Sequence, residues 1–506
     1  MSRRNGGIIG PTNTPVGGLI TGVAGGVWRM NDVLTFVSNN QWPKGPENIE
    51  NSCRFDDGSN DNFTRTQDDG NKRTWTASWW VKRTNLGINT TMWDAGTSGG
   101  NNYSPIFFQS DDTIRFYEVV GGSLQSFNFI TDQVFRDTSA WYHIVYRVDT
   151  TQSTQSDRVR LYINGTQVTS FSTAAYPAQN YDTTKNNSSY RTTIGTAADN
   201  DGNDLDAYLA EFVHVDGQSL EPTSFGETDS TTGIWKPKKI GSFTSAGDNS
   251  FYLDFKDSSN LGNDASGLNN DFTVNNLTSI DQSTDTCVEN FATLNSLDNY
   301  YFGGTFSEGN LKVLSVSSVE SYITGTIGLS TGKWYWEIKI TSSGSGRDFV
   351  GIVDKVAETS SFSAYSGNSN AISYYGYTGD SKAGSTTTNS SWGATFGTGD
   401  TIGVAMDLDN NKIYFSKNGT FQNSGDPTSG STGTGALAIP TSPVSGFYFP
   451  QFANIHNTAS TYEANFGNPP HTISSGNSDA NGFGNFEYAV PSGYYALNTS
   501  NLNTYG

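Results

Sequence analysis

The chain has 506 residues, and 29 Lys and Arg against 49 Asp and Glu give it a formal net charge of −20. Such an acidic chain lacks the cationic footprint of nucleic-acid-binding proteins, so that class is excluded. Aromatic residues make up 13% of the sequence, which argues against a long disordered polymer. No apolar run is long enough to cross a bilayer as a helix, so membrane insertion is not expected. The abundance of Gly, Asn, Ser and Thr predicts an all-β protein of short strands and polar turns.

Residues 1–50 form a Gly- and Pro-rich segment with no hydrophobic period, apart from a short helix predicted over 31–37. A segment of this kind has no core of its own, so we expect it to be an extended N-terminal attachment segment held by other chains. That expectation makes the protein a homo-oligomer, with a trimer favoured.

Strand signals follow one another over residues 51–228. Residues 75–83 (WTASWWVKR) place Trp75, Ala77, Trp79 and Val81 on one face at period two. Further strands are predicted over 106–109, 113–119, 126–130, 141–149 and 209–216, and Asn164-Gly165 marks a tight hairpin within 158–168. Four of these elements together resemble the laminin-G-like, or concanavalin-like, jelly roll, namely Trp79 to Arg83, Trp141 to His143, Val159 to Gly165 and Ala210 to Leu220.

Residues 229–298 read as a connecting segment with one or two strands, 251–255 and 272–277. The next unit, 299–468, begins its strong signals with GKWYWEIKI at 332–340, where Trp334, Trp336, Ile338 and Ile340 share a face. Together with 349–353 (FVGIV), 399–409 (GDTIGVAMDLD), the Asn418-Gly419 hairpin and the closing 464–467 (ANFG), this order resembles the SPRY domain, a bent β-sandwich. Residues 469–506 read as a C-terminal tail that packs onto a neighbouring chain.

A catalytic set is not apparent in the sequence. His143 and His214 lie within strands and are interpreted as packing residues, and there is no Gly-x-Ser-x-Gly elbow or P-loop. Glycosidase jelly rolls need paired carboxylates, whereas Glu211 and Asp216 are five residues apart on one strand and are expected on opposite faces. We therefore expect a protein that is not an enzyme.

The acidic turn 199–206 (DNDGNDLD) is the best candidate for a metal site. Its carboxylates, Asp199, Asp201, Asp204 and Asp206, alternate with small residues, as a calcium loop requires. The alternative is a solvated hairpin turn without metal, and no other cofactor is expected.

An aromatic loop in the second unit is a candidate ligand platform, made of Tyr374, Tyr375, Tyr377 and Trp392. Aromatic faces stack on sugars and anchor protein interfaces. The alternative interpretation is that these rings alternate into the core. Whether Cys53 and Cys287 pair is left open by the sequence.

The overall layout resembles bacteriophage virion structural proteins, especially those of marine phages: a leader with Gly7 to Pro11, Gly26 to Trp28 and Trp42-Pro43, then a laminin-G-like and a SPRY-like domain. The resemblance implies a tail fibre or tail appendage that joins other virion proteins through its N-terminus and presents lectin-like domains to a host surface glycan. Its place would be the virion, assembled in the host cytoplasm and released by lysis. The alternatives are a capsid decoration or head fibre protein and a secreted glycan-active enzyme.

Overall fold

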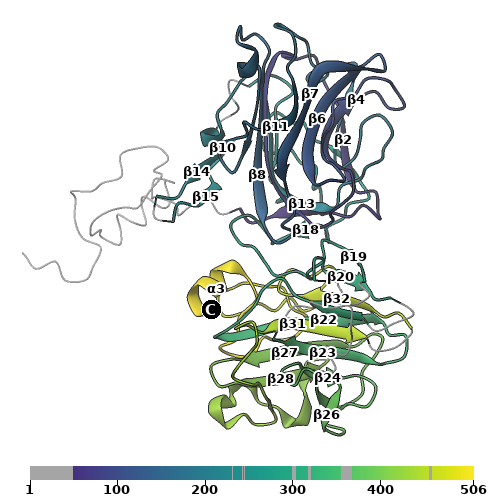
Figure 1. Cartoon of the computed structure of the whole chain (residues 1–506), viewed down its shortest axis with the longest axis vertical. Coiled ribbons are helices and arrows are strands. Elements are labelled where there is room, and N and C mark those ends of the chain that lie inside the picture. The colour runs from purple at the N-terminus through teal and green to yellow at the C-terminus, as the bar shows by residue number, and fades with distance from the viewer. Residues whose placement is uncertain are drawn as a thin grey trace, which may run out of the picture.

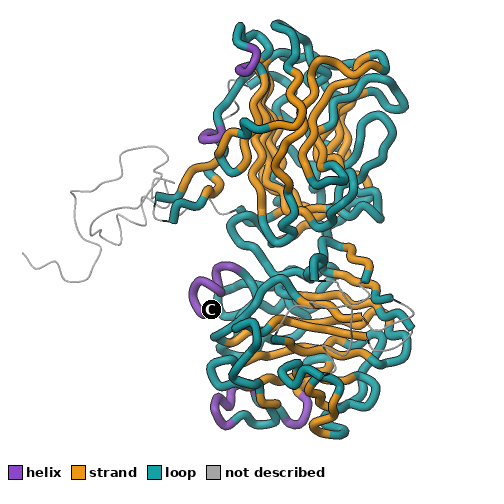
Figure 2. The backbone as a smooth tube through the Cα atoms, in the orientation of Figure 1, coloured by secondary structure: helices purple, strands orange, loops and turns teal. Residues whose placement is uncertain are grey.

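The computed structural model describes residues 49–230, 232–241, 243, 246–298, 304–316, 321–354, 367–454 and 458–506. Two β-sandwiches follow one another along the longest axis of the molecule (Figures 1 and 2). Strand accounts for 40% of the structure and helix for 5%, which confirms the all-β prediction. The predicted helix at 31–37 and nearly all of the attachment segment lie outside the described residues.

The first sandwich consists of two antiparallel sheets, here called sheets 1 and 2. Sheet 1 contains β10 (Thr166–Gln167), β9 (Val159–Ile163), β8 (Trp141–Asp149), β3 (Thr74–Arg83), β13 (Ala207–Asp216), β1 (Ser52–Phe55) and β18 (Gln282–Ser283), with β16 (Phe251–Leu253) beside β13. Sheet 2 contains β11 (Phe171–Ala175), β7 (Ser123–Val134), β6 (Thr113–Val120), β5 (Ile106–Phe108), β4 (Thr90–Gly96), β12 (Arg191–Ile194), β2 (Asn62–Thr66) and β17 (Thr273–Asn275). A separate hairpin pairs β14 (Gly226–Thr228) with β15 (Trp235–Pro237).

The predicted face of β3 forms the centre of this core. Trp75, Ala77, Trp79 and Val81 are all buried between the sheets, and Trp79 stacks on Phe212 of β13 at 5.1 Å between ring centroids. Burying an aromatic or aliphatic side chain of this size contributes roughly 1.5–3 kcal/mol to stability. The Asn164-Gly165 hairpin is confirmed: both residues have positive φ, 47° and 76°, as a two-residue turn between β9 and β10 requires.

The second sandwich is built in the same way from sheets 3 and 4. Sheet 3 contains β19 (Thr305–Ser307), β20 (Lys312–Leu314), β32 (Thr461–Asn465), β22 (Lys333–Ser342), β27 (Thr401–Asp407), β28 (Lys412–Lys417) and β29 (Thr420–Phe421), with β30 (Leu437–Ala438) beside β28. Sheet 4 contains β21 (Ser321–Thr324), β31 (Phe449–Asn454), β23 (Asp348–Val353), β24 (Ile372–Tyr375), β25 (Ser381–Ala383) and β26 (Thr386–Asn389). Trp334, Trp336, Ile338 and Ile340 of β22 all enter the core, as predicted.

Among the described residues, helical structure is confined to short pieces. These residues include four 3₁₀ turns, η1 (Gln155–Asp157), η2 (Pro222–Ser224), η3 (Gln422–Ser424) and η4 (Pro427–Thr432), and one α-helix, α3 (Thr499–Tyr505). In α3 the Asn498 side chain accepts from the Asn501 N–H, a standard N-cap. Among the residues placed in the structure, no helix is long and apolar enough to span a bilayer.

Two segments behave differently from their sequence prediction. Residues 229–298 add β15, β16, β17 and β18, and the last three extend the two sheets of the first sandwich rather than linking the domains with one or two strands. Residues 469–506 pack onto the second sandwich of their own chain: Phe486, Tyr494 and Ala496 are buried against Tyr335 and Tyr414. The sequence predicts β16 and β17, within 251–255 and 272–277, but not β15 and β18, which are too short to show a period. The residues against which the tail packs are far away in sequence.

A polar seam joins the two sandwiches. Lys82 on β3 donates to Asp285 and to Asn290, each at 2.7 Å, and the Tyr208 hydroxyl donates to the Gly309 carbonyl at 2.9 Å. The Asn310 amide donates to the Thr84 carbonyl at 2.9 Å. The two domains therefore meet through specific buried hydrogen bonds and not through a flexible linker alone.

Candidate ligand-binding site

A hollow of about 150 Å³ opens on the outer face of sheet 2. Side chains from β4, β5 and β6 form its floor, because residues there alternate with those that enter the core. The loop between β12 and β13 forms its rim, and this is the acidic turn singled out from the sequence. The lining residues are Thr91, Asp94, Tyr103, Pro105, Phe107, Tyr117, Ala197, Asp199, Asn200 and Asn203.

Aromatic rings provide the apolar part of the floor. Tyr117 packs edge-on against Tyr103 at 6.0 Å and against Phe107 at 5.9 Å between ring centroids. The Arg115 guanidinium lies 4.2 Å over the Tyr117 ring, which holds that ring in place by a cation–π contact. Tyr103 and Tyr117 are half-buried, so part of each ring is available to a ligand.

A fixed carboxylate provides the polar part. Asp94 is fully buried, and its Oδ1 accepts from the backbone N–H groups of Ala95 at 2.7 Å and Ser104 at 2.8 Å. Its Oδ2 accepts from the Ala198 N–H at 2.8 Å, which ties β4 to the rim loop. Burial raises the pKa of Asp94, while Lys185 and these hydrogen bonds oppose the shift. The Asp94 carboxylate thus holds the loop between β12 and β13 against the strands that form the floor of the hollow.

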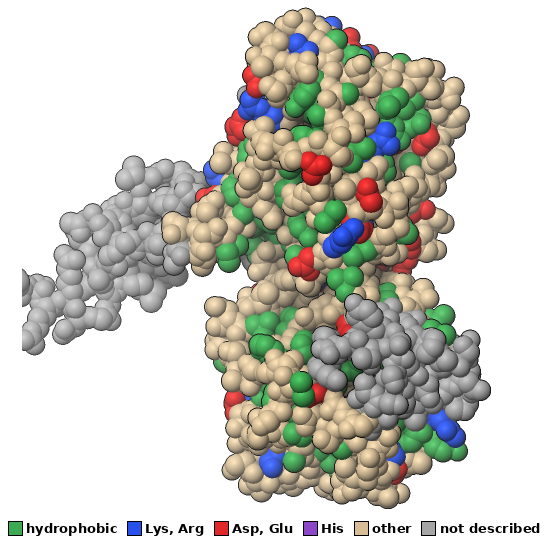
Figure 3. Space-filling model, in the orientation of Figure 1, with side chains coloured by type: hydrophobic (Ala, Val, Ile, Leu, Met, Phe, Trp, Pro, Cys, Tyr) green, Lys and Arg blue, Asp and Glu red, His purple; other side chains and the backbone are tan. Residues whose placement is uncertain are grey.

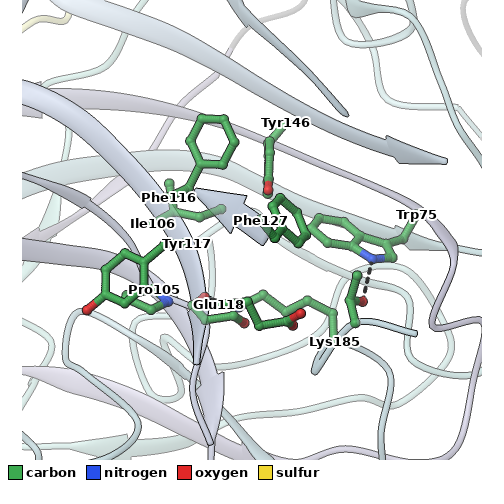
Figure 4. Close-up of a pocket in the computed structure, with 11 residues that line it drawn as sticks. Trp75, Pro105, Ile106, Phe116, Tyr117, Glu118, Phe127, Tyr146 and Lys185 are labelled. Atoms are coloured by element: carbon green, nitrogen blue, oxygen red, sulfur yellow. Dashed lines mark hydrogen bonds between the residues drawn. The ribbon is translucent and has the colours of Figure 1, made fainter. Parts of the chain in front are cut away.

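Beneath the hollow lies a second, almost filled space that shares Pro105 and Tyr117 with it. Figure 4 shows Lys185 and Glu118 on one side of this space and Trp75, Phe116 and Tyr146 on the other. The Lys185 ammonium donates to the Ser104 carbonyl at 3.1 Å and lies 4.0 Å over the Trp93 ring. Burial lowers the pKa of Lys185 to about 7 and raises that of Glu118. This charged layer supports the floor from within.

The predicted calcium site does not form as expected. Of its four carboxylates only Asp199 lines the hollow, and Asp201 pairs instead with Arg191. Asp206 points away into the protein, where it accepts from the Thr84 hydroxyl at 2.6 Å and burial raises its pKa to about 8. Among the described residues, which include this whole turn, no three acidic, His or Cys side chains converge to hold a metal ion. The carboxylates do not converge because Leu205 and Asp206, which directly precede β13, are already buried in the protein.

The aromatic residues chosen in the second sandwich are also dispersed. Tyr374 and Trp392 lie in the main core, 5.6 Å apart between ring centroids, and Tyr375 stacks on Phe349 at 4.5 Å on the other side of sheet 4. Tyr377 is 53% exposed, with the Arg347 guanidinium 5.0 Å over its ring. Strand alternation in β24 therefore places Tyr374 and Tyr375 on opposite sides of sheet 4. Tyr377 lies beyond the strand, 6.3 Å from Tyr375 between ring centroids, and is the exposed member of the set.

The two strand histidines are packing residues, as predicted. His143 stacks on Trp80 at 4.6 Å, contacts the Ser78 hydroxyl at 2.8 Å and accepts from the Trp235 indole N–H at 2.9 Å. Burial lowers the pKa of both His143 and His214 to about 3. Each is therefore neutral at physiological pH, and of the two only His214 keeps a ring nitrogen, Nδ1, without a hydrogen-bond partner among the described residues.

The carboxylates Glu211 and Asp216 of β13 are engaged in separate contacts. Glu211 lies at a β-bulge with φ of 51° and accepts from the Tyr252 hydroxyl at 2.6 Å. Asp216 accepts from the Asn71 backbone N–H at 2.8 Å. The two cysteines are both free, with Cys53 buried in the core and Cys287 half-buried.

Sequence reasoning missed most of the hollow. Asp94, Tyr103, Phe107 and Tyr117 come from separate strands and loops, and only Phe107 and Tyr117 fall in strands that the sequence predicts, 106–109 and 113–119. The signal in the sequence is an aromatic residue at the strand position that alternates with the core positions. In β6, Phe116 is buried in the core and the next residue, Tyr117, faces outward. A search for aromatic residues on the outward positions of neighbouring strands would have found part of the site.

Comparison with known proteins identifies the two sandwiches. Residues 57–221 match the Concanavalin A-like lectin/glucanases superfamily, and residues 333–440 match the SPRY domain. The chain therefore carries a laminin-G-like, or concanavalin-like, domain followed by a SPRY domain, as the sequence motifs indicated. Domains of these two kinds suggest carbohydrate or protein binding.

Several solved structures are similar to part of this chain. The SPRY domain of human HERC1 is 17% identical, with 30% of this chain and 87% of that chain covered and a TM-score of 0.25. The heptameric SAP-like pentraxin of Limulus polyphemus is 14% identical, with 41% and 94% covered and a TM-score of 0.28. Domain 4 of AbnA, a GH43 extracellular arabinanase of Geobacillus stearothermophilus in complex with arabinotriose, is 16% identical, with 30% and 65% covered and a TM-score of 0.23. No curated protein matches this sequence.

Proposed function

We propose that the first sandwich binds a surface glycan in the hollow on sheet 2. The observation that carries the proposal is that one hollow is lined both by two half-buried tyrosine rings, Tyr103 and Tyr117, and by polar side chains. Sugars present apolar C–H faces that stack on aromatic rings and hydroxyls that hydrogen-bond to carboxylates and amides. Asp199, Asn200 and Asn203 on the rim supply such groups.

The visible surface is consistent with a binder of neutral polar ligands. In Figure 3 the backbone and uncharged polar side chains dominate the face shown, and the charged side chains are scattered rather than gathered into one patch. We propose that the chain acts by binding and not by hydrolysis. The supporting observation is that Glu211 and Asp216 are each committed to their own hydrogen-bond partners.

The wider role that we propose is that of a bacteriophage virion protein, a tail fibre or tail appendage. The supporting observation is the layout of the sequence, in which a coreless leader precedes two binding-type sandwiches. The leader would join other virion proteins and fix the chain as an oligomer, a trimer in our proposal. The two sandwiches would then face the host cell.

Glycan binding is tested with the full chain on a glycan array, followed by calorimetry on the glycans retained. Tyr117→Ala is expected to weaken binding about threefold to tenfold, because a stacked ring contributes about 0.5–1.5 kcal/mol. Tyr377→Ala is the matched control, since it removes an exposed tyrosine from the second sandwich. If Tyr377→Ala abolished binding and Tyr117→Ala did not, the site would lie on the SPRY domain and the hollow would be excluded. Release of reducing ends from the bound glycan would contradict the non-enzymatic role.

The virion role is tested by deleting residues 1–43. The described sandwiches have their own cores, so the truncated protein is expected to fold, with an unchanged melting temperature, yet to be missing from purified particles. Normal incorporation of the truncated protein would contradict the attachment role. Antibody labelling in electron micrographs of intact particles distinguishes the tail, which we expect, from the capsid.

A further inference from the structure

A second hollow, of about 240 Å³, lies in the seam between the two sandwiches. One wall is the segment that leads into and through β18, with Ser279, Ile280, Gln282 and Thr284. The other wall is the chain that follows β32 and the segment that packs back on it, with Asn468, Pro469, His471, Thr472, Ile473 and Asn485. The hollow therefore exists only when both domains are docked.

An unpartnered amide lies in this wall. Asn468 is 3% exposed, and its Oδ1 accepts from the Ser283 hydroxyl at 3.0 Å across the seam. Its Nδ2 has no hydrogen-bond partner among the residues that the structure describes. A buried N–H donor without an acceptor is unfavourable, and a ligand oxygen or an ordered water beside it would remove that penalty.

The lining is polar but almost free of charge. Hydroxyl groups come from Ser279, Thr284 and Thr472, amides come from Gln282 and Asn485, and Ile280 and Ile473 add apolar surface. His471 is the one titratable residue in the lining, and its Nδ1 faces the Glu463 carboxylate at 2.9 Å. The nearby Arg54 guanidinium is likewise engaged, with Glu308 at 3.2 Å and with the Pro469 carbonyl at 3.4 Å. A charged ligand would therefore find no free countercharge among the residues described as lining this hollow.

We propose that this seam is a second ligand site, for a neutral, hydroxyl-rich molecule of the size of one or two sugar units. The ligand would accept a hydrogen bond from Asn468 Nδ2 and exchange further bonds with the hydroxyl and amide groups of both walls. Because both domains contribute to the site, an occupied seam holds the two sandwiches together. The site does not depend on the hollow of sheet 2, although it takes the same class of ligand.

The experiment uses the full chain carrying Tyr117→Ala, so that the hollow of sheet 2 is disabled. The probes are methyl glycosides of glucose, galactose, mannose and N-acetylglucosamine, with sialic acid as the charged comparator, and binding is read by ligand-observed NMR titration. At least one neutral glycoside is expected to bind, and sialic acid is not. Thr472→Trp, which fills the hollow from an exposed position, is expected to abolish the signal, and Asn468→Leu is expected to weaken it about tenfold by removing the amide donor.

Thr386→Trp on β26 is the matched control, because this exposed threonine lies at the far end of the second sandwich from the seam (Figure 1). It should leave the titration unchanged. The proposal is overturned if no neutral glycoside binds, if sialic acid alone binds, or if Thr472→Trp behaves like Thr386→Trp. Failure of the sheet 2 site is recognised separately, since Tyr117→Ala would then leave glycan-array binding intact.

Discussion

Lys82 Nζ lies 2.7 Å from Asp285 Oδ2, and both side chains are buried at the seam between the sandwiches. Lys82 belongs to the central strand β3 of the first domain, while Asp285 follows β18 in the segment that leads to the second. The Trp141 indole N–H also donates to Asp285, at 3.2 Å. This ion pair fixes the path of the chain between the domains.

Breaking that pair from one side should be costly. Lys82→Met leaves the Asp285 carboxylate buried without its countercharge, and we expect a loss of about 3–5 kcal/mol in the free energy of unfolding. The double variant Lys82→Met/Asp285→Leu should lose less, since no uncompensated charge remains. Urea denaturation monitored by tryptophan fluorescence gives the values. Lys236→Met is the surface control, because its pair with Asp229 is partly exposed and is worth less than about 1 kcal/mol.

Stability should fall as pH rises through the range in which Asp206 titrates. Burial raises the pKa of Asp206 to about 8 in the folded protein, above the value of about 4 in an unfolded chain. The folded state then binds more protons between these values, so this group lowers stability with rising pH by at most about 1.4 kcal/mol per unit. Asp206→Asn should flatten the dependence between pH 5 and 8 in chemical denaturation, while its amide oxygen still accepts from Thr84. An unchanged slope in this variant would mean that Asp206 is not the group responsible.

Removal of calcium should have no effect on the first sandwich. The carboxylates of residues 199–206 are dispersed, so addition of a chelator is expected to shift the melting temperature by less than about 1 °C. Asp201→Asn should change stability by less than about 1 kcal/mol, because the contact it removes is an exposed ion pair with Arg191. Differential scanning fluorimetry with and without calcium checks both statements. A calcium-dependent rise in melting temperature that Asp201→Asn abolishes would restore the metal site.

The C-terminal segment should detach when Glu337 is removed. The Glu337 carboxylate accepts from the backbone N–H groups of Glu487 at 2.9 Å and Tyr488 at 2.8 Å, and from the Tyr335 hydroxyl at 3.0 Å. Glu337→Ala leaves these donors without an acceptor and should destabilise the segment by about 2–4 kcal/mol. Limited proteolysis with mass spectrometry should then show earlier cleavage within 469–506. Glu487→Gln, which alters only the exposed contact with Ser474, is the control and should be cleaved at the wild-type rate.

Local pattern was enough to determine the strands that build the two cores. The alternation of Trp75, Ala77, Trp79 and Val81, and that of Trp334, Trp336, Ile338 and Ile340, is read directly from the sequence because a strand repeats every two residues. The Asn-Gly hairpins and the packing role of His143 follow from the same local rules. The sequence also indicated the two domain types through motifs that lie within single strands.

Tertiary structure alone decided the sites and the docking of the segments. Asp206 looks like a metal ligand in sequence, but its position at the buried start of β13 turns it toward Thr84. The hollow of sheet 2 unites Asp94, Tyr103 and Tyr117 from different strands and loops, and the seam unites β18 with residues near Asn468, almost two hundred positions later. The C-terminal segment finds Glu337 across a similar separation. Such contacts depend on the order of the strands in each sheet and on which carboxylate lies beside which backbone N–H group. A local hydrophobic period shows which residues share a face of a strand, but it does not show which distant residues come into contact.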